Sequence, residues 1–111
     1  MNRNRLLELF CANLSNAIVH QILETAIDVP EISEKYFKEV KNSWQIAKNY
    51  REKINPVNRS LPSHDLEEIK AKVINNITAE LKLRIDRGYT NINLSLVPEF
   101  VDKALKELNV I

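Results

Sequence analysis

Glycine, cysteine and tryptophan are nearly absent from this chain, which contains one of each. With a single glycine, Gly88, the chain cannot build a glycine-rich phosphate loop, so nothing indicates a nucleotide cofactor. The single cysteine, Cys11, cannot form an internal disulfide and leaves no zinc-finger spacing. No charged segment leads into a long apolar run followed by a cleavage site. We therefore expect no cofactor and a cytoplasmic location.

Neither sign of charge is in excess, because 28% of the residues are charged and the net charge is only +1. Such a balance requires neither nucleic acid nor an anionic membrane as a partner. Arg3 and Arg5 at the start of the chain are expected to be solvated. Polar residues interrupt the most apolar segment and argue against a membrane span: Asn13, Asn16, His20 and Gln21. The 111 residues, 44% of them hydrophobic, fit a single domain covering 1–111.

Helical periodicity dominates the first half of the sequence. From about residue 3 to 28, apolar residues recur at helical spacing over an unusually wide face, which predicts a helix covered on more than one side, centrally in a bundle or by a second subunit. Val29 and Pro30 end it. A second helix is expected over 31–54, with an apolar face and an opposite charged face that includes Lys48, Arg51 and Glu52.

The second half predicts two further helices. Asp65, with Glu68 three residues later, is expected to cap a helix over 65–87 whose buried stripe is Ile69, Val73, Ile77 and Leu81. Gly88 follows where a helix end needs a positive φ angle. Residues 89–97 alternate between apolar and polar types and predict an extended arm, or a strand edge paired with its copy. Pro98 opens a last helix over 98–108. The fold class is therefore all-α: a small four-helix bundle-like domain with one short extended arm before the last helix.

The connector NPVNRSLPSHD, residues 55–65, holds the main candidate for catalysis. Arg59 and His64 have the R-x4-H spacing, which resembles the active-site motif of HEPN-type RNases. That resemblance implies a dimeric all-helical enzyme that needs no metal, in which His64 handles proton transfer and Arg59 stabilises the phosphorane charge. Pro62 inside the spacer departs from the family's pattern. The other interpretation is a stiff connector.

Two further patterns carry possible chemistry. His20, Glu24 and Asp28 follow one another at intervals of four on the first helix, so they share a face and could bind a divalent metal; a solvated row is the alternative, and we expect no metal. Aromatic residues interleave with lysines on the second helix, as in single-strand nucleic-acid binding. Because these aromatics follow the helical period, core packing is the preferred interpretation.

The excess of apolar surface leads to the main functional expectation. We expect a non-enzymatic α-helical protein-interaction module that self-associates as a homodimer, because wide apolar faces are usually buried in a partner. A HEPN-like RNase using Arg59 and His64 is the alternative, and a non-catalytic nucleic-acid-binding protein is the second alternative. The sequence does not identify the pathway or a further protein partner.

Overall fold

The structure, a computed structural model, describes residues 2–26, 29–55 and 61–110. Over these residues the chain forms α1 (Arg3–Ala26), α2 (Pro30–Ile54), α3 (Ser63–Asp86), the short 3-10 helix η1 (Leu94–Leu96) and α4 (Val97–Glu107). The all-α class with four α-helices is confirmed, and the predicted boundaries that fall on described residues hold within about two residues. The expected end of the first helix at 27–28 lies outside the described residues.

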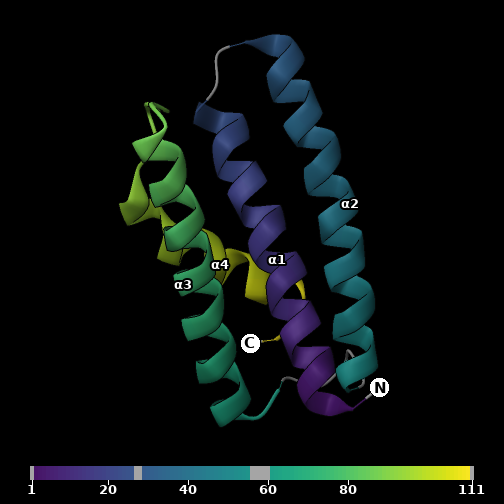
Figure 1. Ribbon diagram of the computed structural model, residues 1–111. Coiled ribbons are helices and arrows are strands. Elements are labelled where there is room, and N and C mark those ends of the chain that lie inside the picture. The colour runs from purple at the N-terminus through teal and green to yellow at the C-terminus, as the bar shows by residue number, and fades with distance from the viewer. Residues whose placement is uncertain (1, 27–28, 56–60, 111) are drawn as a thin grey trace.

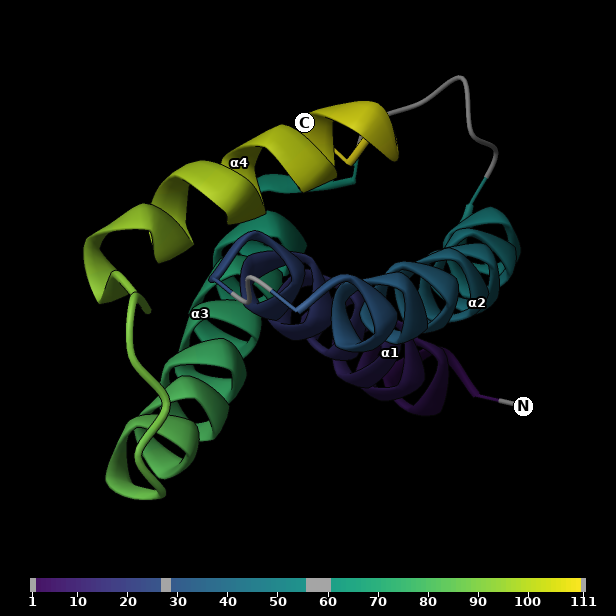
Figure 2. The same cartoon turned by 90° about the horizontal axis from the view of Figure 1, so that it is seen from above.

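The three long helices lie side by side, with α1 between α2 and α3 (Figure 1). α2 runs antiparallel to α1 after the turn that Pro30 opens, and Pro30 occupies the first turn of α2 where its missing N–H costs nothing. α4 crosses the back of this layer and packs on α3 (Figure 2). The molecule measures 40 × 23 × 22 Å, and its longest dimension is close to the length of its three long helices.

The central position of α1 explains its wide apolar face. Its buried residues point toward α2, α3 and the side that α4 crosses, and they include Phe10, Leu14, Ile18 and Leu23. The predicted stripe of α3 is confirmed, since Ile69, Val73, Ile77 and Leu81 are all at most 1% exposed. Of the two ways to cover α1 that the sequence left open, the chain itself supplies the first. The width of this face therefore does not by itself require a second subunit.

The extended arm or strand edge expected over residues 89–97 is not extended throughout, because η1 occupies Leu94–Leu96 and α4 begins at Val97. Ile92 and Leu94, two of its alternating apolar residues, do pack against the core. However, the Asn93 side chain accepts a hydrogen bond from the Ser95 amide at 3.0 Å, and this local bond starts the 3-10 turn. Asn91 also takes a positive φ of 64°, which breaks an extended backbone.

The predicted cap at Asp65 is wrong, because α3 begins two residues earlier, at Ser63, after Pro62. Asp65 lies in the first turn of α3, where a carboxylate stabilises the helix dipole, and it is 4% exposed. Its carboxylate pairs with the guanidinium of Arg3, 62 positions away. The expectation that Arg3 is merely solvated is therefore also wrong: Arg3 fastens the start of α1 to the start of α3.

The expectation that Arg51 faces water is wrong as well. Arg51 is 1% exposed, and its Nε donates to the carbonyl oxygen of Leu108 at 3.1 Å while Nη2 donates to that of Asn109 at 2.8 Å. These carbonyls end α4, where helix geometry leaves acceptors unsatisfied and a positive charge is favourable. The side chain of Arg51 therefore ties the end of α2 to the end of α4.

Candidate functional site

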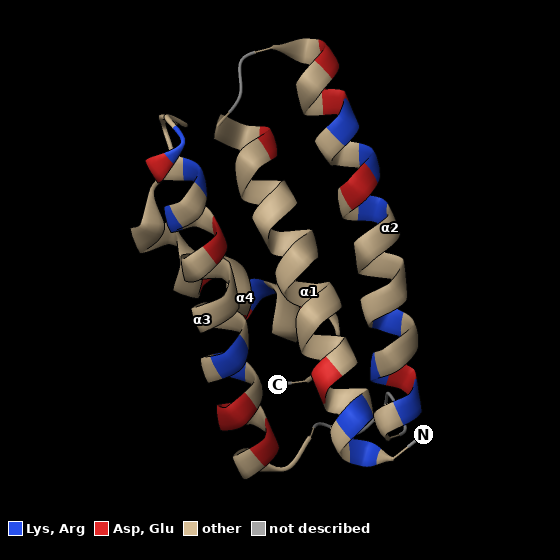
Figure 3. Cartoon of the chain, viewed as in Figure 1, with Lys and Arg blue, Asp and Glu red and all other residues tan. Residues whose placement is uncertain are grey.

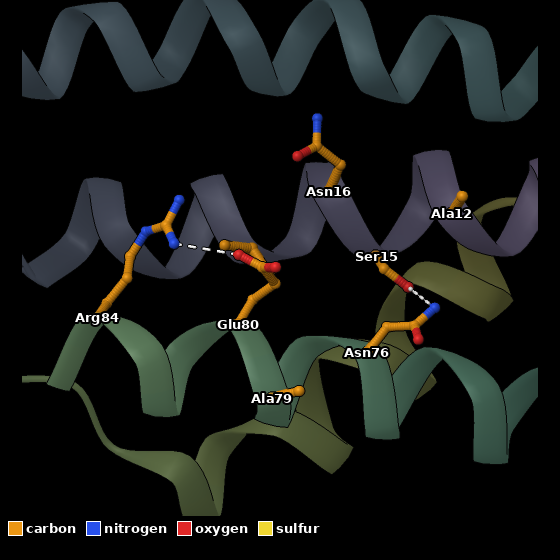
Figure 4. A pocket seen from close by; sticks show the side chains of 8 residues that line it. Ala12, Ser15, Asn16, Asn76, Ala79, Glu80 and Arg84 are labelled. Carbon is orange, nitrogen blue, oxygen red and sulfur yellow. Dashed lines mark hydrogen bonds and ion pairs between the residues drawn. The ribbon is translucent and has the colours of Figure 1, made fainter. Parts of the chain in front are cut away.

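A groove runs between α1 and α3. Its volume is about 390 Å³. Short side chains leave it open, because Ala12 and Ser15 on α1 and Ala79 on α3 line it where longer residues would fill the space (Figure 4). The complete lining is Ala12, Ser15, Asn16, Val19, Asn76, Ala79, Glu80 and Arg84.

The polar side chains in the groove are held by bonds within the fold. Ser15 Oγ donates to the Cys11 carbonyl at 2.7 Å and accepts from Asn76 Nδ2 at 3.4 Å, across the groove (Figure 4). Asn16 Nδ2 donates to Ser43 Oγ of α2 at 2.8 Å. The groove is therefore a pre-formed surface with fixed amide and hydroxyl groups.

Charged and aromatic groups from three elements meet at one end of the groove. Arg84 Nη1 lies 3.1 Å from Glu80 Oε2 on α3. The imidazole of His20 lies on the other side, with its Nε2 3.2 Å from Glu39 Oε2 of α2 and its ring stacked 5.5 Å from that of Tyr36. This end therefore brings α1, α2 and α3 together through polar side chains.

Burial is the main influence on His20. Desolvation lowers the pKa of His20; Glu39 and Glu80 oppose the change, and Arg84 adds to it. In the neutral imidazole one ring nitrogen carries the proton; we assign it to Nε2, which faces the Glu39 carboxylate, and this leaves Nδ1 as an acceptor. Among the described residues Nδ1 is buried and has no hydrogen-bond partner. The histidine is thus set to stay neutral near neutral pH.

The arrangement suits binding better than bond making. The Ser15 hydroxyl proton goes to a backbone carbonyl, and the Nε2 of His20 is engaged by Glu39, so neither forms the nucleophile-and-base pair that covalent catalysis needs. Burial raises the pKa of the Cys11 thiol to about 11, which keeps it in the unreactive form. Cys11 is a buried core residue, 2% exposed.

The predicted catalytic pair lies only partly within the described residues, because Arg59 falls outside them. His64 lies in the first turn of α3 with its side chain 82% exposed, and its Nε2 is 3.3 Å from Asp65 Oδ1. The structure thus places His64 beside a carboxylate, outside the groove lining.

The predicted metal row is divided in the structure. Asp28 lies outside the described residues, Glu24 is half-buried, and His20 turns toward Glu39 of α2. In the part of the chain that the structure describes, no three His, Cys, Asp or Glu side chains gather as a metal site would require.

α1 also satisfies the length and hydropathy that a membrane-spanning helix needs, with a mean hydropathy of 1.3 over its best window. This differs from the expectation drawn from its interrupting polar residues. Because 56% of that window is buried inside the fold, the same hydropathy also fits the central helix of a bundle.

Sequence reasoning missed the groove. Its signal is the set of small residues just beside the apolar stripes, Ala12 and Ser15 on α1 and Ala79 on α3, which only the pairing of the two helices makes meaningful. Comparisons with protein-family models, with curated proteins and with solved structures found no match. The observed class is therefore a compact all-α protein with a pre-formed interhelical groove, and the functional argument rests on the surface chemistry of the chain itself.

Proposed function

We propose that this protein is a non-enzymatic helical interaction module that forms a homodimer through the side of the molecule holding the groove. We call this side the groove face and define it by Ala12 and Asn16 of α1, Ala79 and Leu83 of α3, and Ile46 of α2. Leu83 lies four residues after Ala79 and therefore shares a side of α3 with this groove residue. Ile46 lies three residues after Ser43, so it shares a side of α2 with the residue that Asn16 binds.

The single observation that carries the proposal is the lack of charge along the α1 side of this face. From Leu9 to Leu23, α1 contains no Lys, Arg, Asp or Glu (Figure 3). The neighbouring Ile46 and Leu83 are 44% and 48% exposed. Exposed apolar residues around an uncharged strip are typical of a surface that is covered by a protein partner.

A second copy is the occupant that this chemistry fits. A two-fold interface presents the same surface from both sides, so the surface must complement itself. Asn16 and Asn76 each use one N–H within the described fold, and an amide still offers a donor and an acceptor beyond that bond. Amides and small apolar side chains therefore match their own copies, whereas a surface of one charge would repel itself.

The size of the groove face sets the expected strength. The strip from Leu9 to Leu23 is about 21 Å long at 1.5 Å per residue. With helix spacings of 8–10 Å on either side, the face covers roughly 400 Å² of each copy. Stable interfaces bury about 800 Å² per partner, so we expect a weak dimer with dissociation in the micromolar range.

Light scattering across a concentration series, from low to high micromolar, tests the proposal. The expected result is a molar mass that rises toward twice the 12.9 kDa of the chain. Ala12→Arg places like charges near the two-fold axis and should leave a monomer. Ala71→Arg is the matched control, because Ala71 is also an exposed helical alanine but lies away from the groove. A monomer throughout the series, or equal effects of both variants, would contradict the proposal.

The RNase hypothesis has one observation in its favour, the exposed imidazole of His64 held beside the Asp65 carboxylate. A carboxylate in that position can orient a histidine for proton transfer. If the hypothesis holds, the protein cleaves RNA in the presence of a chelator, and His64→Gln abolishes cleavage without changing the melting temperature. Cleavage that survives this substitution would exclude His64 as its acid or base.

A further inference from the structure

A second depression lies between α2 and α4, and it shares no lining residue with the groove. Its walls are Val40 and Trp44 on α2 and Phe100 and Ala104 on α4, and its volume is about 130 Å³. It exists because α4 packs on α3 and diverges from α2 (Figure 2). We call it the α2–α4 cleft.

The cleft is too small for a free small molecule, since ligand pockets usually measure about 300–1,000 Å³. Its volume admits one apolar side chain. The apolar surface continues beyond it along α2, where Phe37, 43% exposed, precedes Val40 by three residues and Trp44 by seven. That spacing gives one continuous row on a helix, which is the surface that the apolar face of a partner helix covers.

The rim of the cleft is positively charged. Lys103 lines it from α4, Lys41 follows Phe37 by four residues, and Lys48 follows Trp44 by four, so all three border the apolar row. None of them forms an ion pair with another described residue. Glu107 is the acidic residue in the lining. The lining itself holds one charge of each sign, and Lys41 and Lys48 beside the apolar row add the positive charge that favours an anionic occupant.

The aromatic row argues for protein rather than nucleic acid. Base stacking needs an open ring face. The Nζ of Lys41 already lies 4.6 Å from the ring centroid of Phe37, so one face of this exposed ring is covered by a cation. Trp44 is half-buried and packs against the core.

We propose that the α2–α4 cleft is a docking site for an acidic amphipathic helix of a partner protein. One apolar side chain of that helix enters between Trp44 and Phe100. Its Asp or Glu residues meet Lys41, Lys48 and Lys103. Because the groove face lies elsewhere on the molecule, this site does not depend on homodimer formation.

Trp44 is the only tryptophan of the chain, so its fluorescence reports the cleft directly. The probes are synthetic amphipathic helical peptides that carry Leu, Ile, Met or Phe as the anchor and glutamate on the flanking positions, with a lysine-flanked set as the charge control. We expect glutamate peptides to change Trp44 emission saturably and lysine peptides to leave it unchanged. Added salt should weaken the binding.

Two charge reversals on α4 separate cleft binding from general attraction. Lys103→Glu should weaken binding about fivefold or more, since it replaces an attractive rim charge with a repulsive one. Lys106→Glu changes the net charge equally, but it lies outside the cleft lining and should leave binding within about twofold. Ala12→Arg should bind the same peptides as the unaltered protein, which keeps this test independent of the dimer.

Three results would overturn the proposal. The first is the absence of binding by every glutamate peptide, and the second is binding that leaves Trp44 emission unchanged. The third is equal loss in the Lys103→Glu and Lys106→Glu variants. A single-stranded RNA oligonucleotide that shifts Trp44 emission while the peptides do not would instead assign the cleft to nucleic acid.

Discussion

The guanidinium of Arg51 and the carbonyl oxygen of Leu108 lie 3.1 Å apart, which joins the end of α2 to the end of α4 across 57 positions of sequence. The same side chain binds the Asn109 carbonyl and both oxygens of Asn55. Burial lowers the pKa of Arg51, yet a guanidinium remains charged in proteins. A buried cation thus holds the helix end that completes the fold.

Replacing Arg51 should destabilise the protein strongly. Arg51→Met keeps much of the apolar stem but leaves two helix-end carbonyls unsatisfied, and hydrogen bonds to charged groups contribute about 1.5–3 kcal/mol each. We expect the free energy of unfolding in urea to fall by roughly 3 kcal/mol. Lys48→Met, one turn earlier and exposed, is the control and should change it by less than about 0.5 kcal/mol. Similar values for the two variants would show that the Arg51 bonds contribute little.

His20 should make stability depend on pH. Its pKa in the fold lies below the ordinary value of 6.5, chiefly through burial, so between these two values the unfolded chain binds more protons than the native one. The free energy of unfolding should therefore fall as the pH drops below about 6.5 and keep falling until the native His20 itself takes a proton. Stability conferred by the neutral imidazole is fully present above 6.5.

The two histidines of the chain provide a matched comparison for this effect. Urea unfolding of His20→Gln and His64→Gln should be measured between pH 7 and about pH 5. His20→Gln should lose part of the pH dependence, whereas His64→Gln, which removes a side chain that is 82% exposed, should keep it. Parallel curves for the two variants and the unaltered protein would mean that His20 is not the responsible group.

Cys11 should be nearly inert to thiol reagents in the native protein. Its pKa is raised from 9.0 to about 11, so the reactive thiolate is about a hundredfold scarcer than in an ordinary thiol at the same pH. Its 2% exposure slows the reaction further. A colorimetric thiol assay at pH 8 should show slow modification that accelerates when urea unfolds the chain. Fast native modification would mean that the α1–α3 contact opens readily.

Local periodicity is the part of this fold that the sequence could predict. Ile69, Val73, Ile77 and Leu81 recur every four residues, and each lies buried in α3 because one helix side faces α1. Pro30 starts α2 because its ring fixes the φ angle near the helical value and removes an N–H that the first turn of a helix leaves unbonded. Such features depend only on neighbours along the chain, so they need no knowledge of tertiary structure.

Features that depend on distant residues could not be predicted. Arg51 lies in the same charged pattern as its neighbours along α2. Its buried acceptors are the carbonyl oxygens of Leu108 and Asn109, which only the packed fold brings next to it. Asp65 has the sequence spacing of a cap, yet Arg3 turns it into an ion-pair partner. The groove likewise forms only where the sides of α1 and α3 that carry Ala12 and Ala79 lie next to each other, which the separate helix patterns do not specify.

The helix ends at Gly88 and Asn109 supply the last prediction. Both residues follow a helix and take positive φ angles, 99° and 58°. Both ends also have the same backbone hydrogen bonds. The Gly88 amide donates to the Ile85 carbonyl and the Tyr89 amide to that of Arg84; likewise the Asn109 amide donates to the Lys106 carbonyl and the Val110 amide to that of Leu105. Apart from its two chain neighbours, no described residue has a heavy atom within 4 Å of a methyl group added at Gly88, so Gly88→Ala tests backbone conformation. We expect it to lower the free energy of unfolding by about 1 kcal/mol, because the left-handed conformation is costly for alanine. Asn109→Gly, the converse change, should be neutral or slightly stabilising, since it relieves the same strain. A neutral Gly88→Ala would contradict the prediction, because it would show that alanine takes the left-handed conformation after α3 at no cost in the free energy of unfolding.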